Sequence, residues 1–367
     1  MGTVSNKGTI TAIEGVLIET LDDGKIRIST YDMTKGVRST LEAISIEREG
    51  KYIINAQRLY QTVRVMPEDE VVIDVNDKLN CTVSSGKASF SMFAMRGDEF
   101  PNLPELSGDR GFMISSAKIR LMIGKVAHSI AEMDNRPMLC GAYFKVTDGN
   151  LEVVSCDSYT LSRCSVKCDI TSLFAASDID FAFIIPGHAL SELSKNLAEG
   201  EEDVEFYISR KHAIIKKGDS IFFTRTIDSE YIDYNRITPK DNDITVVVDR
   251  ERFLDGLERA NIVADEKIKG STRSYVKLTT DDQFISITSA SVNGRVSDEM
   301  ECVHEGRDIE IGFNCRYLIN SVKVAEGENI KITLKSPTQA ITIEPAEEDD
   351  EFKYFYMILP VRMNEQK

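Results

Sequence analysis

The stretch FAFIIPGHALSELSKNL, residues 181–197, decides how this sequence is interpreted. An apolar run ends at a proline, and a segment with leucines on one helical face follows directly. Proline is favoured in the first turn of a helix, because its missing N–H would have no partner there. The stretch therefore predicts a buried strand that runs straight into an amphipathic helix.

The same strand, turn and helix recur twice elsewhere in the chain. Residues 52–65, YIINAQRLYQTVRV, and residues 309–324, IEIGFNCRYLINSVKV, follow the same order. When Leu59, Leu190 and Leu318 are aligned, the copies stand 131 and 128 residues apart. A period of that size is the length of a domain, so the sequence predicts three tandem copies of one domain.

The segments on either side of this helix repeat as well. Two strands joined by a DG or DD turn precede it, within residues 13–32, 139–157 and 275–291. An acidic or glycine-containing turn and two further strands follow it, beginning at EDEVVIDV, EDVEFYIS and ENIKITLK. Each copy is therefore rich in antiparallel sheet with few helices, an α+β fold. The expected domains are residues 1–108, 109–240 and 241–367.

A further helix is expected before the hairpin of the second and third copies. Residues 115–131 carry one apolar stripe at helical spacing, formed by Ile119, Met122, Ile123, Val126 and Ile130. The other faces of this helix carry Lys118, Arg120, Lys125 and His128, with no acid before Glu132. The third-copy helix, residues 249–264, packs through Phe253, Leu257 and Ala260 and mixes arginines with acids. Its basic character is weaker.

Basic side chains gather on helices although the chain is acidic overall, with a net charge of −16. A few Lys or Arg on one helix would be ordinary solvated surface. Helices without acids at matching places in a chain with 60 Asp and Glu predict a shared basic surface for phosphate contact. The residues expected to face the phosphate groups of the ligand are Arg58, Arg64, Lys118, Arg120, Lys125, Arg136, Lys195, Arg252, Arg259, Arg316 and Lys323.

Composition disfavours several other classes of protein. No apolar run is long enough to span a membrane and the start lacks a secretion signal, so we expect a cytoplasmic protein without a membrane partner. The seven cysteines include no CxxC pair, which disfavours disulfides and a metal site, and no nucleotide-binding glycine motif occurs. A thiol pair of Cys140 with His128 or His188 is imaginable, but no spacing brings them together. We expect neither catalysis nor a cofactor.

Seven motifs in order give the chain a resemblance to a known family over nearly its whole length. They are EFPNLPEL (99–106), NRPMLCGAYFKV (135–146), CDSYTLSR (156–163), FIIPGHALSEL (183–193), DYNRITP (233–239), GFNCRYL (312–318) and YMILPVRM (356–363). The chain resembles the bacterial sliding clamps, the beta subunit of the replicative DNA polymerase III holoenzyme. The resemblance implies a non-catalytic processivity factor in DNA replication, without 3′–5′ exonuclease activity of its own.

The resemblance also implies an assembly and partners. Two copies would join head to tail in a ring around duplex DNA, with helices inside and sheets outside, and contacts that do not depend on DNA sequence. The joint would pair an edge strand carrying Phe90 and Met92 with the third domain near Ile262 and Val263. The polymerase and the clamp loader would dock through a short linear peptide.

The peptide site that the resemblance implies is an apolar cleft between the second and third domains. Its residues would be Leu139, Ser158, Tyr159, Thr160, Leu161, Ile232, Arg236, Ile237, Asn314, Tyr317, Met357, Leu359, Pro360, Val361, Arg362 and Met363. Apolar members would hold a Leu or Phe anchor, and the two arginines would meet polar or acidic peptide groups. Without the resemblance, plain core packing would explain the apolar members.

The sequence departs from the family at its start, and one alternative function stays open. The family begins with a strand and a channel-facing helix before the segment that matches VSNKGTI, so we expect the first copy to lack both. The alternative is a repeat-built, non-catalytic scaffold for protein interactions that does not encircle DNA, its basic helices being only solvated.

Overall fold

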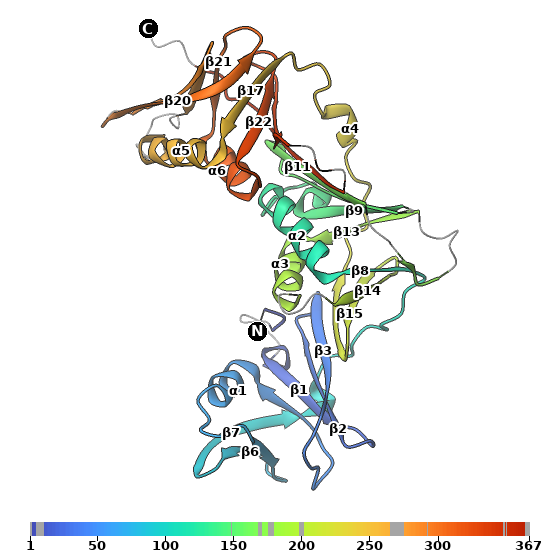
Figure 1. Ribbon diagram of the computed structural model, residues 1–367. Coiled ribbons are helices and arrows are strands. Elements are labelled where there is room, and N and C mark those ends of the chain that lie inside the picture. Colours follow the sequence, from blue (N-terminus) through green and yellow to red (C-terminus); the bar gives the residue numbers. More distant parts are fainter. Residues whose placement is uncertain are drawn as a thin grey trace. The chain divides into compact units, whose positions relative to one another are not determined.

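The computed structural model describes residues 2–4, 11–147, 149–167, 171–174, 180–197, 202–264, 275–291, 293–347, 349 and 351–363 (Figure 1). The chain divides into two compact units. Unit 1 consists of Met1–Ala117, Thr171–Ile179 and His188–Thr226, and unit 2 of Lys118–Ile170, Asp180–Gly187 and Ile227–Lys367. Each unit holds one twelve-stranded antiparallel sheet.

The sheet of unit 1 combines the first copy of the repeat with part of the second. The first copy supplies β1 (Gly15–Thr20), β2 (Lys25–Tyr31), β3 (Lys35–Glu42), β4 (Lys51–Asn55), α1 (Ala56–Val63), β5 (Val72–Val75), β6 (Asn80–Ser85) and β7 (Ala88–Arg96). The second copy supplies β8 (Arg110–Ser115), β12 (Thr171–Ser172), most of α3 (Gly187–Asn196), β14 (Asp203–Ile208), β15 (His212–Lys217) and β16 (Ser220–Arg225).

The sheet of unit 2 combines the rest of the second copy with the third. The second copy adds most of α2 (Ser116–Val126), β9 (Gly141–Thr147), β10 (Asn150–Cys156), β11 (Thr160–Lys167) and β13 (Phe181–Pro186). The link to the third copy carries α4 (Tyr234–Ile237). The third copy is β17 (Ile244–Asp249), α5 (Arg250–Ala264), β18 (Val276–Asp281), β19 (Phe284–Ala290), β20 (Arg295–Glu305), β21 (Glu310–Phe313), α6 (Cys315–Val324), β22 (Asn329–Leu334), β23 (Ile341–Pro345) and β24 (Phe352–Ile358).

The expected threefold repeat is confirmed element by element. Strands β4, β13 and β21 each run into the helix that follows, α1, α3 and α6. In the first and third copies an asparagine caps that helix, because the Asn55 and Asn314 side chains accept bonds from the backbone N–H of Arg58 and Arg316. In the second copy Pro186 stands in that place.

Neighbouring copies join strand to strand. The last strand of the second copy, β16, pairs with β3 of the first, and the last strand of the third, β24, pairs with β11 of the second. The backbone hydrogen bonds of the sheet thus continue from one copy to the next. For this reason the compact units cut across the expected domains, whose boundaries remain a prediction.

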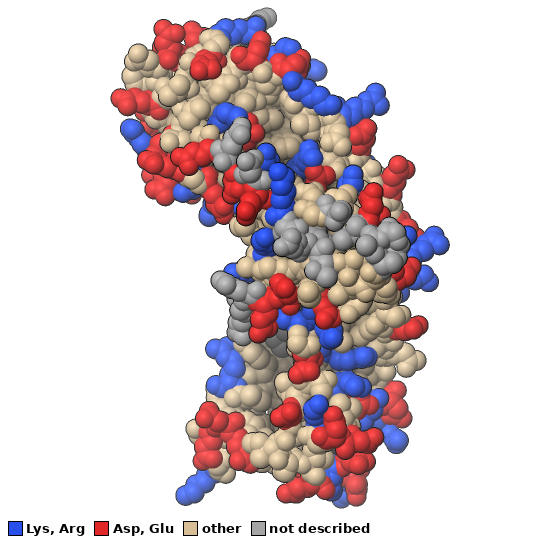
Figure 2. Space-filling model, turned by 45° about the vertical axis from the view of Figure 1, so that its right-hand side comes forward, with Lys and Arg blue, Asp and Glu red and all other residues tan. Residues whose placement is uncertain are grey.

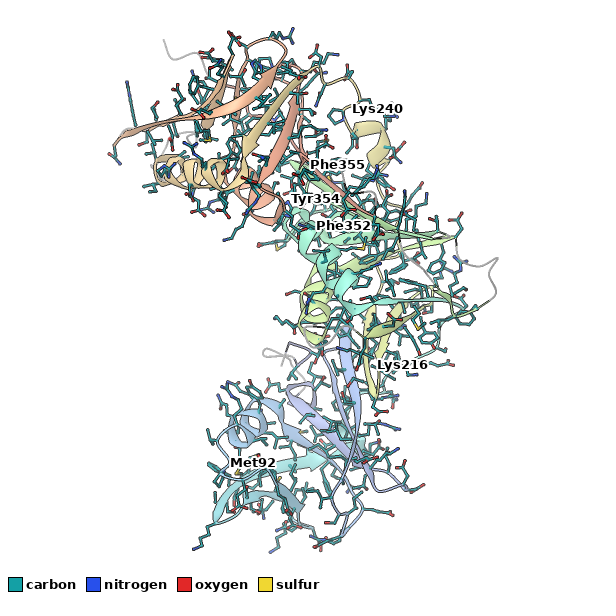
Figure 3. All side chains as sticks on the ribbon, in the orientation of Figure 1. Met92, Lys216, Lys240, Phe352, Tyr354 and Phe355 are labelled. Atoms are coloured by element: carbon teal, nitrogen blue, oxygen red, sulfur yellow. The ribbon has the colours of Figure 1, made fainter. Side chains whose placement is uncertain are left out.

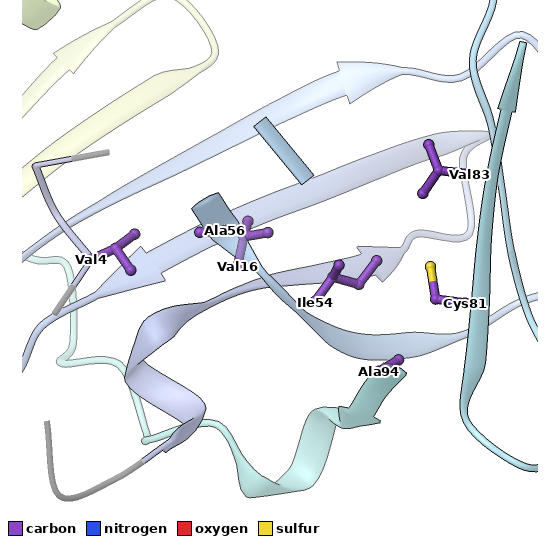
Figure 4. Packing of buried hydrophobic residues seen from close by; sticks show 7 residues of the cluster. All are labelled: Val4, Val16, Ile54, Ala56, Cys81, Val83 and Ala94. Carbon is purple, nitrogen blue, oxygen red and sulfur yellow. The ribbon is translucent and has the colours of Figure 1, made fainter. Parts of the chain in front are cut away.

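Both faces of the first-copy sheet are packed, as strand alternation requires. Val16, Ile54, Ala56 and Val83 belong to a buried cluster on the α1 face, shown in Figure 4 together with Val4. The opposite face carries a second cluster that includes Leu17, Tyr31, Ile53 and Phe223. The two faces of this sheet therefore have different environments.

The helix expected over residues 115–131 is shorter than expected. Helix α2 ends at Val126, and a 3₁₀ turn at Ala127–Ser129 follows. The Val126 carbonyl accepts a 2.6 Å bond from the Ser155 hydroxyl, so a strand side chain occupies an acceptor that a longer helix would use itself. The apolar stripe is confirmed where it meets the core, since Ile119, Met122 and Val126 are fully buried.

Candidate functional site

The residues expected to form the peptide cleft meet within unit 2. Leu139, Leu161 and Met357 belong to one buried cluster, and Ile232 packs against it. The ladder between β11 and β24 sets Leu161 opposite Met357, and a 3₁₀ turn at Pro137–Cys140 brings in Leu139. Strand pairing between copies therefore builds this part of the site.

A tight turn before β11 presents a tyrosine to solvent. The Asp157 carboxylate accepts bonds of 2.9 Å and 2.6 Å from the backbone N–H of Tyr159 and Thr160, and Ser158 adopts a left-handed φ of 80°. Tyr159 is 58% exposed and stacks on Tyr317 of α6, with ring centroids 5.7 Å apart. The stacked pair bridges the second and third copies.

The segment after β24 runs past both copies. The Leu359 N–H donates to the Tyr159 carbonyl at 2.9 Å, and the Val361 N–H donates to the Gly312 carbonyl at 2.8 Å. A side chain at Gly312 would collide with Met363, whose Cγ lies 2.7 Å from the Cβ position. The glycine therefore makes room for Met363 on β21.

An ion pair fixes the chain between the second and third copies. Arg163 donates from Nε to the Glu152 carboxylate at 2.6 Å, and the Tyr234 hydroxyl donates to the same carboxylate. Tyr234 begins α4, which also carries the expected cleft residues Arg236 and Ile237. Both of these, and Arg362, are exposed. Figure 3 labels Phe355, over whose ring Arg163 lies at 6.0 Å.

A buried hydroxyl network, which no pattern in the sequence indicates, lies beneath the turn. The Thr160 hydroxyl donates to Ser129 Oγ at 2.9 Å, and the Ser129 and Ser162 hydroxyls are 2.7 Å apart. His128 Nε2 lies 3.1 Å from Ser162 Oγ and 3.3 Å from Ser321 Oγ on α6. Burial lowers the pKa of His128 to about 4. The network joins an expected cleft residue to α6.

Lys125 corrects one expectation about the basic helix faces. Its side chain is only 4% exposed, and its ammonium donates to the Val324 carbonyl at 2.6 Å and pairs with Glu326 at 2.9 Å. The ammonium also lies 4.5 Å from the centroid of the Tyr354 ring, which Figure 3 labels. A lysine at the C-terminal end of a helix is stabilised there by the helix dipole. Lys125 therefore ties α2 to the end of α6 instead of facing a ligand.

Replacing Lys125 by methionine is expected to lower the free energy of unfolding by about 1.5–3 kcal/mol, the worth of a charged hydrogen bond. The replacement keeps the length of the side chain and removes its charge. Urea denaturation measures this loss. The same substitution at the exposed Lys323 is expected to cost less than about 0.5 kcal/mol. Equal stability of the two variants would contradict the assigned role of Lys125.

The other basic residues expected to face DNA differ in how far they are exposed to solvent. Nine of them are exposed, and Lys118 is half-buried. The exposed residues are Arg58, Arg64, Arg120, Arg136, Lys195, Arg252, Arg259, Arg316 and Lys323. Among them, Arg136 pairs with Asp134, Lys195 with Glu192 and Arg259 with Asp298. Figure 2 likewise shows Lys and Arg interleaved with Asp and Glu on the face in view.

The residues expected at the subunit joint are apolar and partly exposed. In unit 1, Phe90 is 42% exposed, and Met92, labelled in Figure 3, is half-buried against the α1 face. In unit 2, Ile262 is 75% exposed and Val263 is half-buried. Sequence reasoning missed Phe93, which is 78% exposed on the other face of β7.

Comparison with known proteins identifies the family. The DNA polymerase III beta subunit models match in order: the N-terminal domain over residues 1–104, the central domain over 113–233 and the C-terminal domain over 235–362. The chain belongs to the DNA polymerase III beta subunit family. Membership of this family confirms the predicted α+β fold of three clamp domains. It also confirms the predicted function, a non-catalytic sliding clamp for the DNA polymerase.

Individual relatives agree along their whole length. The beta sliding clamp of Bacillus subtilis is 27% identical over 373 residues, covering 98% of this chain and 94% of the relative. That of Halalkalibacterium halodurans is 27% identical over 364 residues, covering 96% and 93%. The crystal structure of the Bacillus subtilis clamp matches with a TM-score of 0.88 at 25% identity, covering 99% and 95% of the two chains. The Thermotoga maritima beta subunit gives 0.89 at 23% identity, with the same coverage.

None of the helices in the described part of the chain is both long and apolar enough to cross a membrane. Within the same residues, no group of three or more His, Cys, Asp or Glu side chains is placed to hold a metal ion.

Proposed function

We propose that two copies of the chain close head to tail into a ring around duplex DNA, and that the cleft residues of unit 2 dock a short peptide of the polymerase or the clamp loader. The observation that carries the ring is the pattern of strand pairing between copies. The last strand of one copy pairs with the strand that follows the hairpin of its neighbour, as β16 does with β3 (after β1–β2) and β24 with β11 (after β9–β10).

This pattern leaves over the last strand of the first copy, β7, and the strand after the β18–β19 hairpin of the third copy, β20. Strand β7 pairs with β6 through residues 88–93 and with β4 only through 94–96, so one edge of 88–93 has no ladder partner among the described strands. Strand β20 pairs with β19 through 295–301 and with β17 only through 302–305, which leaves an equivalent edge among the described residues. A second copy satisfies both edges, with β7 of one subunit on β20 of the other.

The exposed apolar side chains fit this joint. Phe90 and Phe93 lie on β7, and Ile262 lies in the last turn of α5, which packs against β20. A head-to-tail joint made twice closes a dimer, and the Lys and Arg side chains of the helices then supply contacts to the DNA backbone that do not depend on sequence.

Retention on circular DNA tests the ring. The clamp, loaded on nicked circular duplex, is expected to survive a high-salt wash and to be lost when the circle is cut, because topology and not charge retains it. Gel filtration of loaded DNA measures both results. A Phe93→Asp variant, with a charge at the proposed joint, is expected to lose retention. Equal loss from circular and linear DNA would favour a scaffold that does not encircle DNA.

The peptide site has its own test. Deleting the segment from Leu359 onward is expected to weaken binding of a clamp-binding polymerase peptide by about tenfold or more, since such sites rely on a few buried anchors. The deletion begins after β24 and spares its pairing with β11. Calorimetry measures the affinity, with Met363→Ala as a milder variant and the exposed Ile44→Ala as a control. Unchanged affinity of the deletion variant would refute the site.

A further inference from the structure

The hairpins β2–β3 and β10–β11 are equivalent in the repeat, yet they differ at one charged pair. In each hairpin the arginine lies two residue pairs away from the pair that adjoins the turn. Arg38 faces Ser29 across the β2–β3 ladder, and Arg163 faces Val154 across the β10–β11 ladder. They also stand opposite equivalent residues of the neighbouring copy, Ile221 for Arg38 and Phe355 for Arg163. The two arginines therefore occupy the same place in the fold.

Their partners have opposite charge. Arg163 is paired with Glu152, whose carboxylate also accepts the Tyr234 hydroxyl. The residue equivalent to Glu152 is Arg27, since Glu152 faces Ser165 and Arg27 faces Thr40 at the same distance from the turn. The first copy thus sets two guanidinium groups side by side where the second copy has an ion pair.

The chain itself leaves these guanidinium groups poorly satisfied. The Nε atoms of Arg27 and Arg38 are both buried, and neither has a hydrogen-bond partner among the residues that the structure describes. Among these residues Arg27 has one loose ion pair, with Glu19 at 3.7 Å, and Glu19 is shared with Lys51 at 3.1 Å. Arg38 has no ion pair with any described residue. Burial, and then the charge of Arg27, lower the pKa of Arg38, and the opposing effect of the Glu19 carboxylate is smaller than these two.

A second ion pair near this site also has its acid and base in reversed positions compared with the equivalent pair of the third copy. Lys216, labelled in Figure 3, stands opposite Ile221 and pairs with Glu205 at 3.4 Å. In the third copy, the equivalent ion pair runs the other way, from Lys331 to Glu344 at 2.7 Å. Lys216 thus lies on β15, the strand that pairs with β16 at Ile221, and so on the side of Arg38. At the junction of the second and third copies, the equivalent position on β23 is the acid Glu344.

The position of the pair on the sheet indicates the class of ligand. Arg27 and Ser29 point to the same side of β2 as Tyr31, which belongs to the cluster opposite α1. The α1 arginines proposed to contact encircled DNA lie on the other side. An anion that reaches Arg27 and Arg38 therefore comes from a partner other than that DNA, and the Arg27 side chain is 36% exposed to receive it.

We propose that Arg27 and Arg38 form a carboxylate-binding site that receives a Glu or Asp side chain from an acidic segment of a protein partner. The incoming carboxylate takes the place that Glu152 fills between the strands of the second copy. Paired arginines suit a carboxylate, because each guanidinium donates two parallel hydrogen bonds.

Binding of a labelled oligoglutamate peptide to the full chain tests this site. Fluorescence anisotropy at low ionic strength is expected to show binding that oligoglutamine of the same length lacks. Arg38→Gln is expected to weaken binding about tenfold, the worth of one charged hydrogen bond, whereas Arg96→Gln changes it less than about twofold. Arg96 is an exposed arginine of the same unit, so the control removes the same charge. Equal losses in the two variants would overturn the proposal.

A second variant keeps the test independent of folding defects. Arg27→Glu copies the second-copy arrangement and is expected to raise the melting temperature while abolishing oligoglutamate binding, because the new side chain occupies the site. Retained binding by this variant would overturn the proposal. Oligothymidylate serves as a competing probe: if Arg38→Gln weakens its binding and leaves that of oligoglutamate unchanged, the acidic protein segment is the wrong ligand.

Discussion

Replacing Glu152 by alanine is expected to lower the free energy of unfolding by about 3 kcal/mol, the lower end of the cost of breaking a buried ion pair. Glu152 is only 7% exposed and satisfies both Arg163 and the Tyr234 hydroxyl. Its removal leaves a cation and a buried phenol without a partner. The lower end applies because the Arg163 side chain is 33% exposed and water compensates part of the loss.

A double replacement separates the ion pair from simple packing. When Arg163→Met accompanies Glu152→Met, most of the stability is expected to return, because no charge remains buried alone. Urea denaturation of the two single variants and the double variant measures the interaction. Purely additive losses would show that the pair is not coupled. Tyr234→Phe, which removes only the hydroxyl, is expected to cost about 1 kcal/mol.

The second large effect is a loss of stability in acid caused by His128. Its pKa is about 4 in the folded chain, below its value of about 6.5 in an unfolded chain. Protonation therefore favours unfolding. The stabilising contribution is complete above about pH 6.5 and is lost as the pH falls towards about 4, where the loss amounts to about 3 kcal/mol.

Comparison with His128→Gln isolates this contribution from the titration of the carboxylates. Between about pH 6.5 and pH 4 the free energy of unfolding of the unchanged chain is expected to fall more steeply than that of the variant. His212→Gln serves as the control, because burial lowers the pKa of the more exposed His212 by less than that of His128, so its substitution is expected to change the slope less. Parallel curves for the His128 variant and the unchanged chain would contradict the assigned environment.

Much of the fold could be predicted because it depends on local patterns that occur three times. The strand that runs into a helix at residues 181–197 has both its signals in the sequence, an apolar run and a proline, and the structure places β13 and α3 there. The apolar stripe of α2 follows in the same way from helical spacing. Such features need only neighbouring residues, so a single sequence contains them.

The burial and the partners of individual charged residues could not be predicted in this way. Lys118 and Lys125 belong to one helix with one pattern, yet the first is half-buried and the second is enclosed by Glu326 and Tyr354. Both partners lie more than 200 residues further along the chain. Nothing near Lys125 in the sequence distinguishes it from a surface lysine.

Short-range periodicity is enough to predict the three copies, the alternation of apolar residues in their strands and the order of strands and helix in each. The way the copies join, with β16 on β3 and β24 on β11, and the charged residues that this brings together depend on contacts between distant parts of the chain. Strand register places the Glu152 carboxylate beside Arg163 and the Arg27 guanidinium beside Arg38, and it brings together residues that no local pattern connects.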